Sequence, residues 1–166
     1  MKRSSKSQSR LDPQTRSTGA AAAAQDTLLD SFALYRAVFA AAPDGMAIID
    51  VDGVYLEQNE AHRALIGYSD DELQGQTPAI HLGATAFADI GAALAKTGYF
   101  HGEVVSYTKH GPLAIELSAA AVKDNNGNTI AYIGVKRDIS RLRAAETELR
   151  ERLDHREVLH ELSTAV

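Results

Sequence analysis

The chain has 166 residues, a net charge of -5 and no cysteine. This length predicts one domain around a single core, and the acidic balance gives no reason to expect nucleic acid or an anionic membrane surface as a partner. The lack of cysteine excludes disulfides, thiolate metal ligands and thiol catalysis. No apolar run reaches the length of a membrane span and the basic start lacks the apolar part of a signal peptide, so we expect a cytoplasmic protein.

The start of the chain predicts a tail followed by a helix. Residues 1–26 are rich in Ser, Gln, Arg and Ala and carry no stripe of large apolar residues, which predicts a disordered tail. Residues 27–42 predict an N-terminal flanking helix that Pro43 ends. Its apolar face consists of Leu28, Leu29, Phe32, Tyr35, Val38 and Phe39.

A hairpin and a capped helix are predicted next. Residues 45–58 place two apolar runs on either side of Asp52 and Gly53, a pair suited to a tight hairpin turn. Asn59 is a good N-cap for the helix that follows, and Gly67 is suited to end it.

The middle of the chain predicts two helical segments joined by an irregular connection. Ser69 and Glu72 have the spacing of a capping box, so a short helical turn begins there. Residues 77–83 predict the connection. Residues 84–96 then predict a helix of mostly small residues, which Gly98 ends.

Three strands are predicted in the second half of the chain, over residues 99–108, 113–122 and 130–136. Together with the hairpin and the helices, they favour one antiparallel sheet with its helices on one face. The predicted fold class is therefore α+β.

The last predicted strand runs directly into a helical pattern. Asp138 lies between the two patterns and is suited to cap the helix, because its carboxylate can accept from exposed amides of the first turn. The segment 139–166 is an amphipathic linker helix in which a heptad repeat predicts a parallel coiled coil; a helix packed back on its own domain is the alternative. The heptad positions are Ile139, Leu142, Glu146, Leu149 and Leu153.

Two stretches of the chain resemble a PAS domain with its C-terminal PAC part. They are PDGMAIIDVDGVYLEQNEAHRALIGYSDDELQGQ from Pro43 and GEVVSYTKHGPLAIELSAAAVKDNNGNTIAYIGVKRDIS from Gly102. They resemble the family's hairpin, its Asn-capped helix with a following GYS-x-x-E-L-x-G segment, and its three closing strands with a D-I-T-like ending. The resemblance implies a PAS domain over residues 43–138, with a five-stranded sheet in the order 2-1-5-4-3.

The resemblance also implies a function. PAS domains sense small molecules, light or redox state in a cleft between sheet and helices, and they act as dimerisation and relay modules in signalling proteins such as two-component kinases. We therefore expect a non-catalytic sensor that forms a homodimer and controls a downstream signalling domain of the same chain through its last strand. The expected signal junction is Asp138, Ile139 and Ser140, and the expected dimer contacts are Leu142, Leu149 and Leu153.

The known cofactors of this family need residues that the chain lacks. Blue-light flavin domains need a cysteine for their adduct, redox flavin-binding relatives place a tryptophan against the flavin, and this chain has neither. Haem-binding relatives use a histidine on the long helix before the third strand, which is residues 84–96 here and contains none. His81 precedes that helix and is expected to be structural or solvated. We expect no haem, flavin or metal, and leave open a small apolar ligand.

The cleft is expected to be lined by apolar side chains from several elements. The many alanines of the chain either bring sheet and helices close together or leave room for a modest ligand, and the sequence leaves both open. The candidates are Ile48, Tyr55, Leu65, Phe87, Ile90, Leu94, Val105, Ile115, Leu117 and Tyr132.

Two other functions stay open. If side chains fill the cleft, the domain is a protein-interaction scaffold without a ligand. His160, followed by Glu161 and Leu162, also resembles the phosphoacceptor motif of histidine kinases, although the Arg and Pro expected just after it are missing. The sequence has no nucleophile elbow, phosphate-binding glycine loop or zinc motif that would indicate another enzyme.

Overall fold

The computed structural model describes residues 13–164, and these fall into two units that meet between Ala41 and Ala42. The first unit is helix α1, Pro13–Ala41. The tail predicted for residues 1–26 is therefore wrong from residue 13 onward, and the rest of it lies outside the described residues. Proline suits the first turn of a helix, and the alanine run 20–24 has high helix propensity. Residues 13–26 therefore form a helix through backbone preference, although they contain no stripe of large apolar residues.

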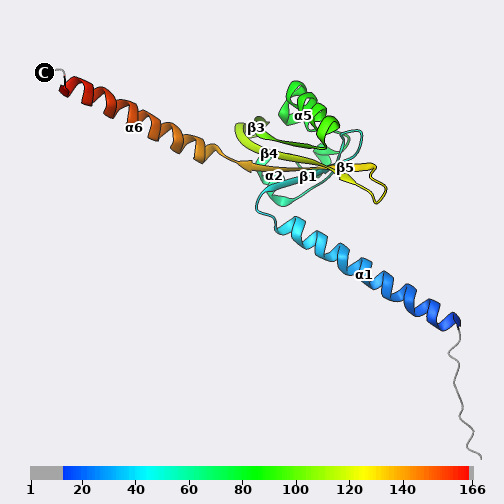
Figure 1. Ribbon diagram of the computed structural model, residues 1–166. Coiled ribbons are helices and arrows are strands. Elements are labelled where there is room, and N and C mark those ends of the chain that lie inside the picture. Colours follow the sequence, from blue (N-terminus) through cyan, green and yellow to red (C-terminus); the bar gives the residue numbers. More distant parts are fainter. Residues whose placement is uncertain (1–12, 165–166) are drawn as a thin grey trace, which may run out of the picture. The chain divides into compact units, whose positions relative to one another are not determined.

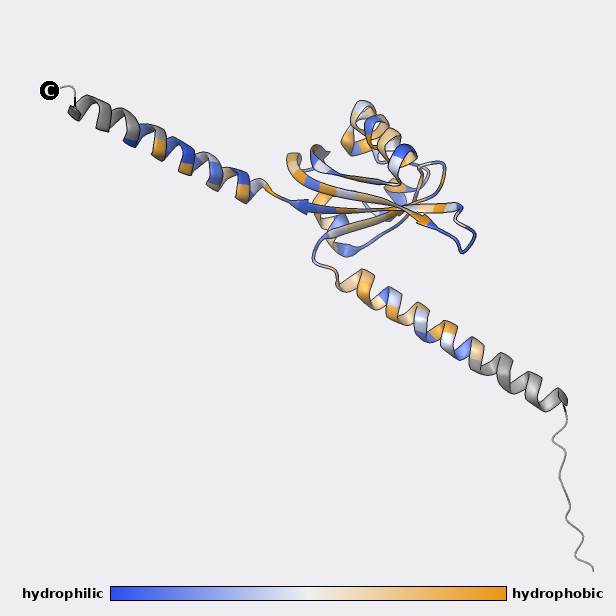
Figure 2. Ribbon diagram, viewed as in Figure 1, coloured by the Kyte–Doolittle hydropathy of each residue, from blue (hydrophilic) through white to orange (hydrophobic). Residues whose placement is uncertain are grey.

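Helix α1 carries an apolar surface along its C-terminal half, as Figure 2 shows. Tyr35 stacks on Phe39, with ring centroids 5.6 Å apart, and lies 6.3 Å from the ring of Phe32. The large side chains of this half that are exposed to solvent are Leu28, Leu29, Phe32, Leu34, Tyr35 and Val38.

The second unit contains one antiparallel sheet of five strands in the order β2-β1-β5-β4-β3 (Figure 1). This confirms the predicted α+β class and strand order, and it makes the last strand central. The strands are β1 Gly45–Ile49, β2 Tyr55–Gln58, β3 Tyr99–Thr108, β4 Gly111–Lys123 and β5 Thr129–Asp138.

Four helices lie between β2 and β3 in the chain: α2 Glu60–Ile66, α3 Asp70–Leu73, α4 Ala79–Leu82 and α5 Ala84–Thr97. They pack on one face of the sheet, where α2 and α3 cover β1 and β2, and α4 and α5 cover β4. Helix α4 replaces the irregular connection predicted for residues 77–83. It is a single turn, which is too short to produce a periodic sequence pattern.

Asn59 joins the first helix of the sheet unit to the first strand. Its Oδ1 accepts from the amide of His62, as expected of an N-cap, and also from the amide of Met46, both at 2.8 Å. Its Nδ2 donates to the carbonyl of Asp44 at 3.0 Å. The predicted capping box of Ser69 and Glu72 is present as well.

The register of the sheet determines which residues face the helices. In β5, Gly134 pairs with Ala47 of β1 and with Ala119 of β4, and both partners are buried in the core beneath the helices. Side chains alternate along a strand, so Tyr132 and Lys136 lie on this same face. Ile133 therefore lies on the opposite face.

A single residue connects β5 to helix α6, Ser140–Thr164. Asp138 Oδ1 accepts from the amide of Ser140 at 2.8 Å, close to the predicted capping role. Ile139 is buried, and its amide donates to the carbonyl of Ala114 in β4 at 3.1 Å. Arg143 forms an ion pair with Glu103 of β3, so the first turn of α6 is fixed to the sheet.

Beyond this turn, α6 is exposed along residues 141–153, including Leu142, Leu149 and Leu153. Figure 2 shows hydrophobic positions at intervals along this mainly hydrophilic helix. Within residues 13–164, no helix combines the length and the apolar character needed to cross a membrane.

Candidate ligand site

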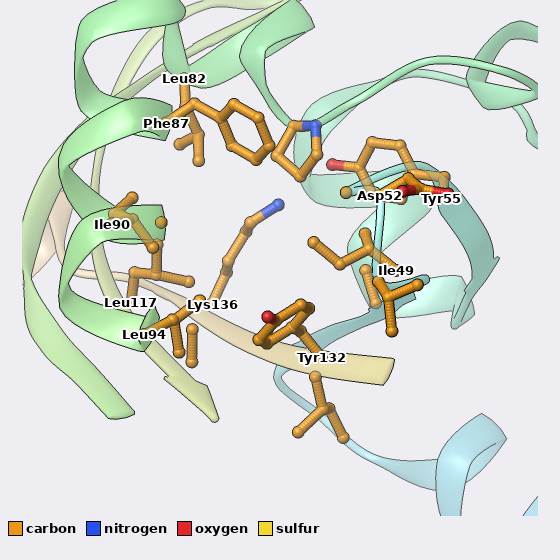
Figure 3. A pocket seen from close by; sticks show the side chains of 18 residues that line it. Ile49, Asp52, Tyr55, Leu82, Phe87, Ile90, Leu94, Leu117, Tyr132 and Lys136 are labelled. Atoms are coloured by element: carbon orange, nitrogen blue, oxygen red, sulfur yellow. The ribbon is translucent and has the colours of Figure 1, made fainter. Parts of the chain in front are cut away.

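A cavity of about 220 Å³ lies between the sheet and helices α4 and α5 (Figure 3). Its walls are mostly apolar, and its volume approaches the lower end of the range for small-molecule sites. The sequence left open whether the alanines bring the sheet and the helices close together or leave room for a ligand. The structure has a space between the two layers.

Six of the ten predicted cleft residues line this cavity, and four do not. Ile48 and Val105 pair with Ile133 and Ala114, which places both on the opposite face of the sheet. Ile115 is fully buried in the core, and Leu65 packs against that core. The six that line the cavity are Tyr55, Phe87, Ile90, Leu94, Leu117 and Tyr132.

Gly91 of α5 also lines the cavity, and a Cβ added there would meet nothing within 4 Å. We expect Gly91→Ala to raise the free energy of unfolding by about 0.5–1 kcal/mol, because alanine loses less backbone entropy in a helix. Gly98 is the matched control, since it also has open space but a φ of +74°. Gly98→Ala should lower the same quantity by about 1 kcal/mol. Urea denaturation measures both, and shifts of equal sign would contradict this account.

Lys136 is the main residue of the site that the sequence analysis missed. It is 3% exposed, although it lies on an otherwise apolar wall of the cavity. The alternation in β5 was the available signal, because Tyr132, Gly134 and Lys136 must share one face. Figure 3 shows the lysine side chain extending from β5 into the middle of the pocket, with its nitrogen between Phe87 and Tyr55.

The Lys136 amine lies against two histidines from different helices. Its Nζ is 2.6 Å from Nε2 of His62 on α2 and 3.0 Å from Nε2 of His81 on α4. The hydroxyl of Tyr55 is 2.7 Å from the same Nε2 of His81. Both histidines have no exposed surface. We call Lys136, His62, His81 and Tyr55 the lysine–histidine cluster.

The hydrogen-bond partners of each ring determine its tautomer. Gln58 donates its Nε2 to Asp70, so its Oε1, 2.7 Å from His62 Nδ1, accepts the proton of that nitrogen. His81 Nδ1 lies 3.0 Å from the hydroxyl of Ser106, which can donate or accept. A protonated Lys136 can only donate to His81 Nε2, so the proton of His81 lies on Nδ1 when Lys136 is charged. With the protons on both Nδ1 atoms, each Nε2 presents a lone pair to Lys136.

Burial shifts the proton equilibria of the whole cluster. It lowers the pKa of Lys136 to about 7. Burial, followed by the charge of Lys136, lowers the pKa of His62 and of His81 far enough to keep both rings neutral. Burial raises the pKa of the Tyr55 hydroxyl. The cluster therefore holds one amine that changes charge near neutral pH, among groups that do not.

His81 was expected to be either structural or solvated. It is buried and hydrogen-bonded, so its role is structural. Both ring nitrogens are engaged, Nδ1 by Ser106 and Nε2 by Tyr55 and Lys136. A haem iron could bind this ring only after one of these contacts had broken. The expectation that the domain holds no haem stays a prediction.

The sheet, the helices that cover one of its faces and the cavity between them define an α+β domain with a mostly apolar pocket between its layers. The sequence matches the PAS fold family over residues 39–144. The chain therefore belongs to the PAS family.

Solved structures agree with this assignment. A domain of a sensory box sensor histidine kinase/response regulator from Geobacter sulfurreducens is 30% identical, with a TM-score of 0.56, over 67% of this chain and 96% of that one. The PAS domain of a protein from Colwellia psychrerythraea is 23% identical, with a TM-score of 0.60, over 66% of this chain and 98% of that one.

A third similar structure is the LOV domain of a blue-light-activated histidine kinase from Erythrobacter litoralis. It is 17% identical, with a TM-score of 0.53, over 59% of this chain and 97% of that one. This likeness concerns the fold alone, since the present chain has no cysteine for a flavin adduct.

Proposed function

We propose that this PAS domain is a sensory and dimerisation module that relays occupancy of its cavity through β5 to α6. One observation carries the proposal: β5 forms a wall of the cavity with Tyr132 and Lys136, and it ends at the junction with α6 only two residues later. A ligand that displaces this wall acts on the strand that continues into the helix.

The dimer part of the proposal rests on α6. Leu142, Leu149 and Leu153 are each more than half exposed in the single chain and recur at heptad spacing. Contact with the same helix of a second copy would bury them. We therefore infer a parallel homodimer in which the seam of α6 changes when the cavity is filled.

The output of the module is proposed by analogy with its neighbours. The Geobacter and Erythrobacter domains come from histidine kinases, which favours a downstream signalling domain of that class acting in the cytoplasm. A net charge of -5 disfavours nucleic acid as the partner. The covered chain is proposed to be non-catalytic. The side chain of His160, the phosphoacceptor of the alternative hypothesis, lies outside the described residues.

Single introduced cysteines test the parallel contact of α6 in the dimer, because the natural chain has no cysteine that could form other disulfides. Under mild oxidation, Leu149→Cys should form a covalent dimer, whereas Ala144→Cys, on the opposite side of the heptad, should do so at least about tenfold more slowly. Cross-linking rates are followed on non-reducing gels. Equal rates at the two positions would contradict the parallel seam.

The effect of an occupied cavity is tested in the same assay. Gly91→Leu adds a large apolar side chain at the wall of the cavity, where an added Cβ meets open space. In the Leu149→Cys background it should change the cross-linking rate more than twofold. An unchanged rate would overturn the relay and favour the ligand-free scaffold.

A further inference from the structure

The cavity contains one buried cation without a counter-ion. Among the residues that line it, Lys136 is the sole basic residue, and Asp52, exposed on the turn between β1 and β2, is the sole acidic one. No acid contributes to the shift in the Lys136 pKa, which follows from burial alone. A charge removed from water in this way is costly unless an opposite charge joins it or the group becomes neutral.

The hydrogen bonds of Lys136 leave one donor for a ligand. A protonated amine has three N–H groups, and the described contacts supply two acceptors, Nε2 of His62 and Nε2 of His81. The second acceptor is shared with the Tyr55 hydroxyl. The remaining N–H is available to the cavity, into which Figure 3 shows the nitrogen pointing.

The remaining walls select the kind of anion. A phosphate or a polycarboxylate carries several charges, and a single lysine in an apolar cavity leaves most of them without partners. Phe87, Ile90, Leu94 and Leu117 instead offer apolar surface to the body of a ligand. The volume equals that of about seven water molecules at about 30 Å³ each, so the cavity suits a small ligand.

We propose that the cavity binds an amphiphilic monocarboxylate of this size, whose carboxylate accepts a hydrogen bond from Lys136 Nζ while its apolar body lies against α5 and β4. The proposal names the ligand class of the sensory function proposed above and rests on it. The two histidines position the amine by accepting hydrogen bonds from its other N–H groups, and the neutral rings leave the positive charge on Lys136.

The first test compares octanoate with 1-octanol, which has the same chain and no charge. Isothermal titration of the full chain at pH 7 should give octanoate an affinity at least about tenfold higher, because a hydrogen bond to a buried charge distinguishes them. At pH 8, octanoate binding should also take up protons, seen as a dependence of the binding heat on the buffer. Equal or tighter binding of 1-octanol would overturn the proposal.

Variants locate the effect at the amine. Lys136→Met should weaken octanoate binding about tenfold or more and leave 1-octanol binding unchanged, whereas Lys123→Met, the same change at an exposed position of β4, should alter neither. Gly91→Leu should weaken both ligands by filling the cavity. If Lys136→Met does not fold, the test is the wild-type preference for octanoate together with the weaker binding of both ligands to Gly91→Leu. Octanoate binding that survives Gly91→Leu would place the ligand elsewhere.

The outcome separates this inference from the relay. Octanoate that binds with the expected preference but leaves Leu149→Cys cross-linking unchanged supports the ligand class and contradicts the relay. The opposite result is also informative. If Gly91→Leu changes the cross-linking rate but the wild-type chain does not prefer octanoate to 1-octanol, the relay is supported and the ligand class is overturned.

Discussion

The free energy of unfolding of the wild-type chain should rise by about 2 kcal/mol between pH 7 and pH 9 because of Lys136. Burial lowers the pKa of this amine from 10.5 to about 7 in the folded chain. Between these two values the unfolded chain keeps a proton that the folded chain has released. Raising the pH therefore favours the folded state, until both states are neutral above the unfolded pKa.

The other groups that face Lys136 titrate outside this window. His62 on α2 and His81 on α4 have lowered pKa values, so their contribution changes only below the ordinary histidine pKa of 6.5. The pKa of Tyr55 on β2 is raised above 10, so its contribution begins only above that pH. The residues that pair with Lys136 in the neighbouring strands, Gly45 and Leu117, do not titrate.

Urea denaturation followed by tyrosine fluorescence at several pH values measures this rise. Lys136→Met should remove it, since methionine keeps most of the side-chain volume and cannot titrate. Lys123→Met, which removes an exposed amine, should keep it. A wild-type chain whose stability is constant from pH 7 to pH 9 would show that Lys136 is not desolvated in the folded state.

Asn59→Ala should lower the free energy of unfolding by about 3 kcal/mol, the largest loss that we expect from one polar side chain. Asn59 is 2% exposed. Its removal takes away the cap of α2 and leaves the amide of Met46 and the carbonyl of Asp44 without this partner. Both effects act in the same direction, because one is a lost helix cap and the other a buried polar group left unpaired.

Asn126→Ala is the matched control. This asparagine lies exposed in the turn between β4 and β5, and its replacement should change the stability by no more than about 0.5 kcal/mol. Urea denaturation at pH 7 compares the two variants. If Asn59→Ala costs no more than Asn126→Ala, the bonds of Asn59 to β1 do not hold α2 in place.

The fold was predictable because its signals are local. The Asn59 cap and the Ser69 capping box each depend on a few neighbouring residues, and the structure contains both. The predicted tail is wrong from residue 13 because propensity alone formed a helix there. Helix α4 was missed because one turn has no periodicity.

The site was predictable only in part, because it depends on which face each strand presents. Choosing Ile48 instead of its neighbours Ala47 and Ile49 reversed the face of β1, and the same error in β3 selected Val105. In β5 the predicted cleft residue Tyr132 lies on the correct face. Lys136 was nevertheless left out, because a lysine is seldom buried in an apolar wall.

The lysine–histidine cluster could not be inferred from any local pattern. His62 and Lys136 are 74 residues apart in the chain and meet only through the packing of α2 against the central strand. Each residue taken alone resembles an ordinary surface group. Their proximity is a property of the sheet order and of the helices that cover it.

The one-residue connection between β5 and α6 has a mechanical consequence. Ile139 is buried, and its amide is hydrogen-bonded to Ala114. Together with the ion pair of Arg143 and Glu103, this contact holds the start of α6 against the sheet. The 25 residues of α6 span about 37 Å at about 1.5 Å per residue. A tilt of about 10° at Ile139 would therefore move the far end by roughly 6 Å, more than one helical turn. The length of α6 alone thus amplifies any tilt at this junction.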